Sequence, residues 1–213
     1  MKKSLFILIF FSVFATAYAC YCQESEIEIK IDANDKIENA LRDNLQQPEK
    51  VLDVIGVKEG MIIGEPGAGR GYFTLKLAKK VGSSGKIYAN DINGDDLTIL
   101  MKRASKTGLK NIETILGHVD DPLFPDGTLD MAIMVWVYAV LSKPVEFLKN
   151  LRKDLKEGGT VVMIVAEPEK TGSNSEIRKR ENILKNIKKA GYRLSRIETF
   201  LEKDSIYIIE PGS

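Results

Sequence analysis

Short apolar runs alternate along the chain with longer segments in which apolar residues recur every three or four positions. The runs end in glycine or polar residues, as buried parallel strands do, and the longer segments have the period of an amphipathic helix. Strands are therefore predicted at 61–65, 86–91, 111–117, 129–135 and 160–166. Between them, the spacing predicts helices at 72–81, 95–107 and 144–155.

Proline and glycine residues mark where several of these helices begin and end. Helical spacing over 37–55 is interrupted at Pro48, so a broken helix is predicted before the first strand. Pro144 suits the first turn of its helix because its missing N–H would have no partner there. Gly158 and Gly159 are suited to capping the end of the same helix.

The last part of the chain differs from the alternating pattern. A basic helix over 176–190 precedes two strands at 195–200 and 205–209, which only 202–204 separate, so they form a hairpin. The whole order predicts an α/β fold, a three-layer sandwich built on a Rossmann-like, mostly parallel seven-stranded sheet with a C-terminal antiparallel hairpin.

The N-terminus carries a separate signal. Lys2 and Lys3 precede an apolar run over 5–14, and Ala17-Tyr18-Ala19 has the small-x-small pattern of a secretory cleavage site. The sequence therefore predicts three segments, which are a signal peptide at 1–19, a linker at 20–36 and one domain at 37–213.

With this leader, the chain is expected to be exported, either to the periplasm or into the medium as a secreted protein. If the leader is not cleaved, it would anchor the chain in a membrane, with Lys2 and Lys3 on the cytoplasmic side. A buried N-terminal helix is the alternative, but the stretch has no polar face and no cap. Cys20 directly follows the predicted cut and resembles a lipoprotein attachment site, from which Ala17 and Tyr18 depart.

Cysteine and metal chemistry are not expected in the domain. Cys20 and Cys22 are two residues apart, so a disulfide between them would be strained. The rest of the chain has one histidine and no cysteine, which gives no zinc site of the usual ligand types.

Composition and charge narrow the class of partner. With 44% apolar and 29% charged residues, the chain has the composition of an ordinary globular protein. Its formal charge of +1 becomes −1 when Lys2 and Lys3 leave with the leader. A nearly neutral chain gives no electrostatic case for nucleic acid, and the basic residues of 176–190 are interpreted as a solvated helix face.

A glycine-rich turn follows the first predicted strand. It reads Gly64-Glu65-Pro66-Gly67-Ala68-Gly69-Arg70-Gly71, with a glycine at every second position after the acidic residue. In an open parallel sheet, ligands bind beyond the carboxyl ends of the strands, and glycine lets the backbone approach a ligand closely. Asp91 ends the second predicted strand, where a carboxylate can accept hydrogen bonds from both hydroxyls of a ribose.

Other interpretations of these residues stay open. The turn could bind no ligand, and Asp91 could cap a helix or stabilise a turn. A nicotinamide dinucleotide site needs G-x-G-x-x-G, but from Gly67 the completing position is Tyr72. A nucleoside triphosphate loop of the G-x-x-x-x-G-K-[ST] type is absent from the sequence.

Several motifs in order give the chain a resemblance to a known family. They are Glu65-x-Gly67-x-Gly69-x-Gly71, Asp91 within "IYANDI", the block "GHVDDPLFPDGTLDMAIMVWVYAVL" and "LKEGGTVVMIV". Through these motifs, the segment 51–209 resembles class I S-adenosylmethionine-dependent methyltransferases. The resemblance is strongest to the small-molecule methyltransferases of the ubiquinone/menaquinone-biosynthesis type. The resemblance implies S-adenosylmethionine as cofactor and an in-line methyl transfer without a metal.

The resemblance also implies roles for the turn and the second strand. Gly67, Ala68, Gly69 and Gly71 would line the methionine part of the cofactor, and Glu65 would face its amino group. Asp91 would hold the ribose, while Ile92 would pack on the adenine.

The adenine edge departs from the family pattern. Where an acidic residue usually follows glycine, this chain has His118 after Gly117. Asp120 or the amide of Val119 is expected to take over that contact. Pro66 is a second departure, which removes one backbone donor from the turn.

Catalytic groups are less clearly indicated. His118, the only histidine, is a candidate base because imidazole is the side chain best suited to exchange a proton near neutral pH, although its position near the adenine favours binding or exposure. Trp136 and Tyr138 follow the fourth predicted strand and would border the acceptor pocket, with a core position as the alternative for Trp136.

The function predicted from these residues is methyl transfer to a small-molecule acceptor. Two other classes stay open, an exported binding module that keeps the fold without turnover and a nicotinamide-dependent oxidoreductase. The identity of the acceptor and the oligomeric state are left open. Export also leaves open how the domain would obtain a cofactor that is made inside the cell.

Overall fold

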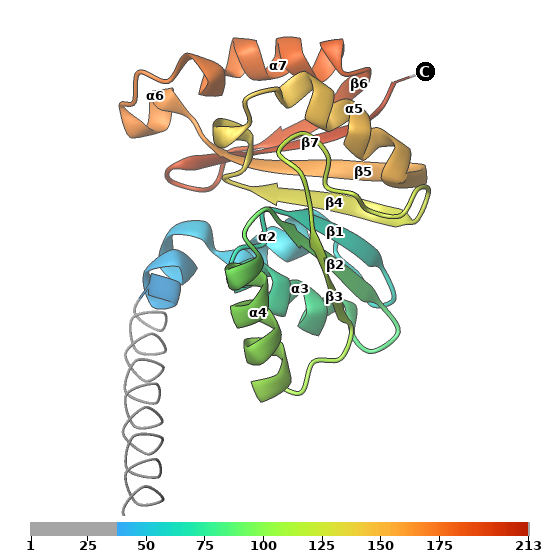
Figure 1. Ribbon diagram of the computed structural model, residues 1–213. Coiled ribbons are helices and arrows are strands. Elements are labelled where there is room, and N and C mark those ends of the chain that lie inside the picture. Colours follow the sequence, from blue (N-terminus) through green and yellow to red (C-terminus); the bar gives the residue numbers. More distant parts are fainter. Residues whose placement is uncertain (1–37, 213) are drawn as a thin grey trace, which may run out of the picture. The chain divides into compact units, whose positions relative to one another are not determined.

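A seven-stranded sheet lies at the centre of residues 45–213 (Figure 1). Its order is β3-β2-β1-β4-β5-β7-β6, and the first five strands in sequence run parallel to one another. Only β7 runs against its neighbours β5 and β6, which confirms the predicted hairpin and fold class. The strands are β1 Ile62–Pro66, β2 Lys86–Asp91, β3 Ile112–Leu116, β4 Leu129–Val135, β5 Leu155–Ala166, β6 Tyr192–Glu198 and β7 Asp204–Pro211.

The computed structural model describes residues 38–212, and the chain divides after Asn44 into the units 1–44 and 45–213. The predicted signal peptide at 1–19 and linker at 20–36, with Cys20 and Cys22, lie outside the described residues. Within 38–212, no helix has the length and apolar character needed to span a bilayer.

Most helices begin and end close to their predicted positions, but the helix predicted at 176–190 is divided at Lys179, whose backbone is extended, into a 3-10 turn and α7. Residues 38–46 are helical, and Gln47 in a left-handed conformation separates them from the next helix, which begins at Pro48. The side chain of Asn93 caps α4 by accepting a hydrogen bond from the Asp95 N–H. The helices are α2 Pro48–Val54, α3 Tyr72–Val81, α4 Gly94–Lys106, α5 Pro144–Asp154, α6 Pro168–Thr171 and α7 Arg180–Lys189, with short 3-10 turns at η1 Tyr138–Val140 and η2 Glu176–Arg178.

Two apolar cores cover the two faces of the sheet. Alternate residues of a strand point to opposite faces, so Val162 and Ile164 of β5 join one core while Val161 and Met163 join the other. The first core also contains buried residues of α2, α3 and α4, and the second contains those of α5 and α7. Figure 1 shows these helix groups on either side of the sheet, which gives the predicted three layers.

The predicted glycine cap of α5 is wrong. The helix ends at Asp154, and β5 begins at the next residue, Leu155, whose buried side chain already belongs to the core. Gly158 and Gly159 instead lie inside β5 at an irregularity, where the pairing passes from Leu155 to Thr160 while β4 advances by two residues. A Cβ on Gly159 would lie 2.9 Å from the Leu129 carbonyl oxygen, so this irregularity needs glycine.

The last turn of α5 buries a carboxyl group. The side chain of Asp154 has no exposed surface, and neither of its oxygens has a hydrogen-bond partner within residues 38–212. Burial raises the pKa of Asp154 to about 7, which Lys153 opposes and the nearby carboxylates of Asp121 and Asp126 support. The folded protein therefore keeps this proton at a pH where the unfolded chain has lost it.

The raised pKa of Asp154 predicts that the free energy of unfolding declines as the pH rises from about 4 to about 7. Its pKa is raised in the folded state, so the free energy of unfolding is highest at low pH in this window and falls as the pH rises. Each pKa unit corresponds to about 1.4 kcal/mol. Asp154→Asn should therefore raise the melting temperature at pH 8 by at least ~4 °C and change it little at pH 4.

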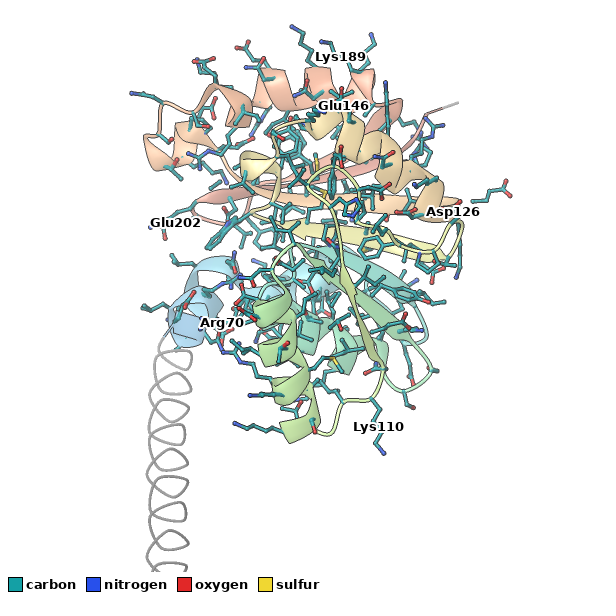
Figure 2. All side chains as sticks on the ribbon, in the orientation of Figure 1. Arg70, Lys110, Asp126, Glu146, Lys189 and Glu202 are labelled. Carbon is teal, nitrogen blue, oxygen red and sulfur yellow. The ribbon has the colours of Figure 1, made fainter. Side chains whose placement is uncertain are left out.

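Asp126→Asn is the matched control, because Asp126 lies nearby with an exposed side chain (Figure 2). Asp126 is the smallest of the contributors to the raised pKa of Asp154, so its removal should raise the melting temperature at pH 8 much less than Asp154→Asn does. Calorimetric melting of the three proteins across pH 4–8 measures the effect. An Asp154→Asn protein that melts below the wild type at pH 8 would contradict an uncompensated buried charge.

Candidate functional site

The order of the sheet reverses between β1 and β4. From β1 the chain moves outward through β2 and β3, and from β4 it moves outward in the opposite direction through β5. At such a reversal the loops beyond the carboxyl ends of the strands separate and leave a crevice for a ligand. A cavity of about 410 Å³ lies at these strand ends, within the size range of small-molecule sites. Its lining comprises Pro66, Gly67, Asn90, Asp91, Ile92, His118, Val119, Val135, Trp136, Val137, Val140, Leu141, Ser142 and Phe147.

Larger hollows exist at other places on the domain. One of about 770 Å³ lies over α2 and α3, and one of about 830 Å³ lies at the amino ends of β1, β2 and β3. Neither touches the carboxyl ends of the parallel strands. The smaller cavity is therefore the candidate site, because its position agrees with the topology of the sheet.

The glycine turn forms one wall of this cavity. Gly67, Gly69 and Gly71 all have positive φ angles, of 70°, 50° and 87°, which other residues adopt only with strain. Two backbone hydrogen bonds fix the turn, from the Ala68 N–H to the Asn90 carbonyl at 2.8 Å and from the Gly71 N–H to the Ala68 carbonyl at 2.9 Å. The turn then leads directly into α3, for which Gly71 is the N-cap.

The three glycines differ in the space around them. A Cβ on Gly67 would lie 2.3 Å from Val137 Cγ2, and a Cβ on Gly71 would lie 2.8 Å from Leu100 Cγ. A Cβ on Gly69 would meet no atom of the described protein within 4 Å. Gly67 and Gly71 thus allow protein segments to pack closely, whereas Gly69 faces open space that a ligand can use.

Asp91 lies beside the turn, as the sequence predicts. Its Oδ2 accepts a hydrogen bond from the Gly69 N–H at 2.8 Å, and its Oδ1 accepts one from the Asn93 N–H at 3.0 Å. Asp91 is half-buried and also lines the cavity. Since a carboxylate has about four acceptor positions, these two bonds leave capacity for ligand hydroxyl groups.

Glu65 lies beneath the turn and is not among the residues that line the cavity. Its carboxylate is buried and accepts a 2.5 Å hydrogen bond from the hydroxyl of Thr74, in the first turn of α3. This bond ties the end of β1 to α3. Ala68 is also turned inward, and its side chain packs in the core. Of the predicted residues in the turn, only Gly67 lines the cavity, and Gly69 reaches it through Asp91.

The predicted adenine contacts fall into two groups. His118, Val119 and Ile92 all line the cavity, and the side chains of Val119 and Ile92 are 60% and 61% exposed. Such exposure of apolar side chains at a cavity mouth is typical of a ligand site. Asp120 does not line the cavity; its carbonyl oxygen accepts a hydrogen bond from the Asn150 side chain.

The two aromatic residues after β4 have different positions. Trp136 lines the cavity and is 40% exposed, so its alternative as a plain core residue is wrong. Tyr138 is 1% exposed, and its hydroxyl accepts a hydrogen bond from Asn186 of α7. Burial raises the pKa of Tyr138 above its ordinary value. The prediction that Tyr138 borders the pocket is therefore wrong, and its side chain is not placed to exchange a proton with a bound molecule.

Asn90 is a site residue that the sequence patterns did not single out. Its buried side chain donates hydrogen bonds to the carbonyls of Ile115 and Pro122, which fixes the end of β2 to β3 and to the next loop. A Cβ on Gly117 would overlap the Asn90 amide, so these two residues need each other. The available signal was a polar residue directly before Asp91, at the strand end where the site lies.

An ion pair between a buried carboxylate, Glu167, and the exposed Arg180 stabilises the end of β5 near this site. Glu167 accepts hydrogen bonds from both the Nε and Nη2 atoms of Arg180 and from the hydroxyls of Ser205 and Tyr207. Burial acts to raise the pKa of Glu167, but the bonds from Arg180, Tyr207 and Ser205 outweigh it and lower the pKa. The carboxylate therefore stays ionised and joins β5 to α7 and β7.

The chain matches a protein family over most of the domain. A family profile described as "Methyltransferase domain" covers residues 57–207, which include every strand that lines the cavity. The matched segment begins before the glycine turn and ends within β7.

Curated methyltransferases are similar in sequence to part of this chain. A demethylmenaquinone methyltransferase of Bacillus velezensis is 28% identical over 125 residues, which are 58% of this chain and 54% of the relative. The chain spans about half the length of the curated relatives it matches.

Solved structures share the fold. A methyltransferase of Aquifex aeolicus described as dependent on S-adenosylmethionine has a TM-score of 0.73 at 29% identity, over 79% of this chain and 92% of that one. A [4+2]-cyclase has a TM-score of 0.66 at 14% identity, over 78% of this chain and 81% of that one. The second similarity concerns the fold alone.

The glycine geometry predicts two different effects of adding one methyl group. Gly67→Ala combines a positive φ with a 2.3 Å overlap on Val137, so it should lower the stability by at least ~2 kcal/mol. Gly69→Ala brings only the strain of the positive φ, about 1 kcal/mol, and should leave a folded protein. Urea unfolding followed by circular dichroism compares both with the wild type. If Gly69→Ala costs as much as Gly67→Ala, the space at Gly69 is not open.

Proposed function

Because this chain belongs to the methyltransferase-domain family, we propose that it transfers a methyl group from S-adenosylmethionine to a small-molecule acceptor. The observation that carries the proposal is the position of Asp91, whose carboxylate contacts the glycine turn at Gly69 and lines the cavity. A nucleoside with an extended polar tail needs both parts, a carboxylate for its sugar and an open backbone for its tail.

The residues around the turn fit this cofactor. Gly69 leaves open space where a Cβ would point, and Asp91 keeps acceptor capacity for two ribose hydroxyls. Ile92 and Val119 present exposed apolar side chains on the same cavity, suited to the two faces of an adenine ring. When bound, S-adenosylmethionine would supply an electrophilic methyl group on its sulfonium sulfur.

The family does not by itself determine what receives the methyl group, but the cavity lining favours one class. Beyond Asp91 and His118, its side chains are uncharged, and Val137, Val140 and Phe147 give the part after β4 an apolar surface. No lysine or arginine belongs to this lining. An uncharged, largely apolar small molecule is therefore the acceptor that these residues would bind best.

The chain's own contribution to the reaction is to bind, orient and exclude water. The Gly69–Asp91 contact fixes the turn relative to the carboxylate that would hold the ribose, and the apolar residues after β4 surround the space for the acceptor. Holding two reactants in line contributes a large part of the rate of such bimolecular transfers. His118 is exposed on the lining and is the residue that could take a proton from an acceptor.

Asp91→Ala tests the proposed cofactor site. Hydrogen bonds to a charged group contribute ~1.5–3 kcal/mol, so this variant should bind S-adenosylhomocysteine about tenfold to a hundredfold more weakly than the wild type. Isothermal titration calorimetry measures the affinity. Asp95→Ala is the matched control, since Asp95 is exposed on α4, does not line the cavity and should bind as the wild type does.

Wild-type protein that gives no binding heat and no shift in melting temperature would contradict the proposal. Binding without methyl transfer to any pool of apolar acceptors would favour the alternative, a ligand-binding protein that keeps the fold without turnover. A fluorescence titration with NADH distinguishes the third class, a nicotinamide-dependent oxidoreductase.

A separate proposal, which rests on the sequence, concerns location. We propose that residues 1–19 direct export and are removed, so that the mature chain begins at Cys20. Mass spectrometry of the protein from a fractionated bacterial host should find chain 20–213 outside the cytoplasm. Leu8→Arg, which interrupts the apolar run, should keep the chain inside. Full-length wild-type protein in the cytoplasm would contradict export, and an acyl mass on Cys20 would identify the lipidated form.

A further inference from the structure

Trp136 lines the cavity together with Gly67 of the glycine turn and with the apolar residues Val137 and Val140. It is the first residue after β4, it has a positive φ of 62°, and its N–H donates to the Ile164 carbonyl at 3.0 Å. A tryptophan rarely adopts this backbone conformation without support from surrounding contacts. The indole is 40% exposed and lines the cavity, so it faces any molecule that binds there.

A buried carboxylate holds this indole. The Trp136 Nε1–H donates to Asp204 Oδ1 at 2.9 Å, and Asp204 is 1% exposed. Asp204 is the first residue of β7, which pairs with Ala166 at the end of β5. Since β5 lies between β4 and β7 in the sheet, the bond from Trp136 passes across the end of β5. The indole is thereby attached to a different strand from the one that carries its backbone.

A lysine holds the backbone around Asp204 in place. The Lys170 ammonium donates to the carbonyl of Asp204 at 2.7 Å and to those of Thr199 and Leu201 at 3.0 Å and 2.7 Å. Lys170 belongs to α6, which follows β5 at the same end of the sheet as the β6–β7 connection (Figure 1). Lys170 therefore holds the backbone around Asp204 in place, which makes Asp204 a rigid support for the indole.

We propose that Asp204 is a positioning residue that holds the Trp136 indole as a wall of the acceptor subsite, and so determines which acceptors fit. The proposal rests on the proposed function, because it concerns the part of the same cavity that the methyl acceptor would occupy. The indole lies in one lining with Gly67 and Asp91 on the cofactor side and with Val137 and Val140 on the apolar side. Its orientation therefore sets the width of the space that the acceptor uses.

The alternative is that the bond only joins β4 to β7. Such a structural link would affect the melting temperature without a specific effect on ligands of the cavity. The chain offers a direct way to separate the two, because Trp136 is its only tryptophan. With excitation at 295 nm, every change in intrinsic fluorescence therefore reports on the surroundings of the Trp136 indole.

The first experiment measures the mobility and exposure of the indole in the full chain. Asp204→Ala should shift the emission to longer wavelength and raise the acrylamide quenching constant at least twofold, because the indole N–H loses its acceptor. Asp204→Asn should stay close to the wild type, since the amide oxygen still accepts the bond. Glu202→Gln is the matched control, as Glu202 projects from the same β6–β7 connection into solvent (Figure 2).

The second experiment measures the subsite with N-phenyl-1-naphthylamine, an uncharged aromatic dye that accepts energy from tryptophan. The wild type should bind it with energy transfer from Trp136, and Asp204→Ala should bind it at least fivefold more weakly. Asp204→Asn should restore the affinity, and Glu202→Gln should leave it unchanged. The affinity for S-adenosylhomocysteine should change less than twofold in all three variants, because the cofactor side keeps its contacts.

Unchanged quenching and unchanged dye affinity in Asp204→Ala would overturn the proposal. If that variant does not fold, Trp136→Phe keeps an apolar ring without the N–H, and dye binding equal to that of the wild type would overturn it in the same way. A wild type that binds the dye but not S-adenosylhomocysteine would instead contradict the proposed function and leave the positioning of the indole supported.

Discussion

The hydrogen bond from the Gly69 N–H to the Asp91 carboxylate is the contact on which the candidate site depends. It joins the turn after β1 to the end of β2, and it does so at the one glycine of the turn that faces open space. On either side of Gly69, Gly67 packs closely on Val137 and Gly71 packs closely on Leu100. The open space at Gly69 is thus a consequence of where side chains are missing as much as of where they are present.

The rest of the domain supports that contact from both faces of the sheet. The two apolar cores fix the strands, and polar contacts fix their carboxyl ends, with Asn90 at β2 and β3 and Glu167 at β5 and β7. On the apolar side of the cavity, the Trp136 indole donates a hydrogen bond to Asp204, which lies far away in the sequence. The cofactor side of the site therefore uses contacts within the β1–β2 region, whereas the acceptor side depends on contacts from the C-terminal hairpin.

This difference explains what could be predicted from the sequence. Strands such as 129–135 and helices such as 72–81 follow from local apolar periodicity, and the glycine turn and Asp91 follow from their places at strand ends. The cap at Gly158 and Gly159 was wrong because the pairing of β5 with β4, a long-range contact, extends the strand back to Leu155. The position of Tyr138 and the support of Trp136 depend on Asn186 and Asp204, and no local pattern reveals such partners.

The most direct test of this account is a crystal structure of the protein with S-adenosylhomocysteine. The account predicts that both ribose hydroxyls lie within hydrogen-bonding distance of the Asp91 carboxylate and that the amino-acid tail passes over Gly69. A ligand bound elsewhere on the sheet, or an Asp91 side chain turned away from Gly69 in the complex, would contradict it.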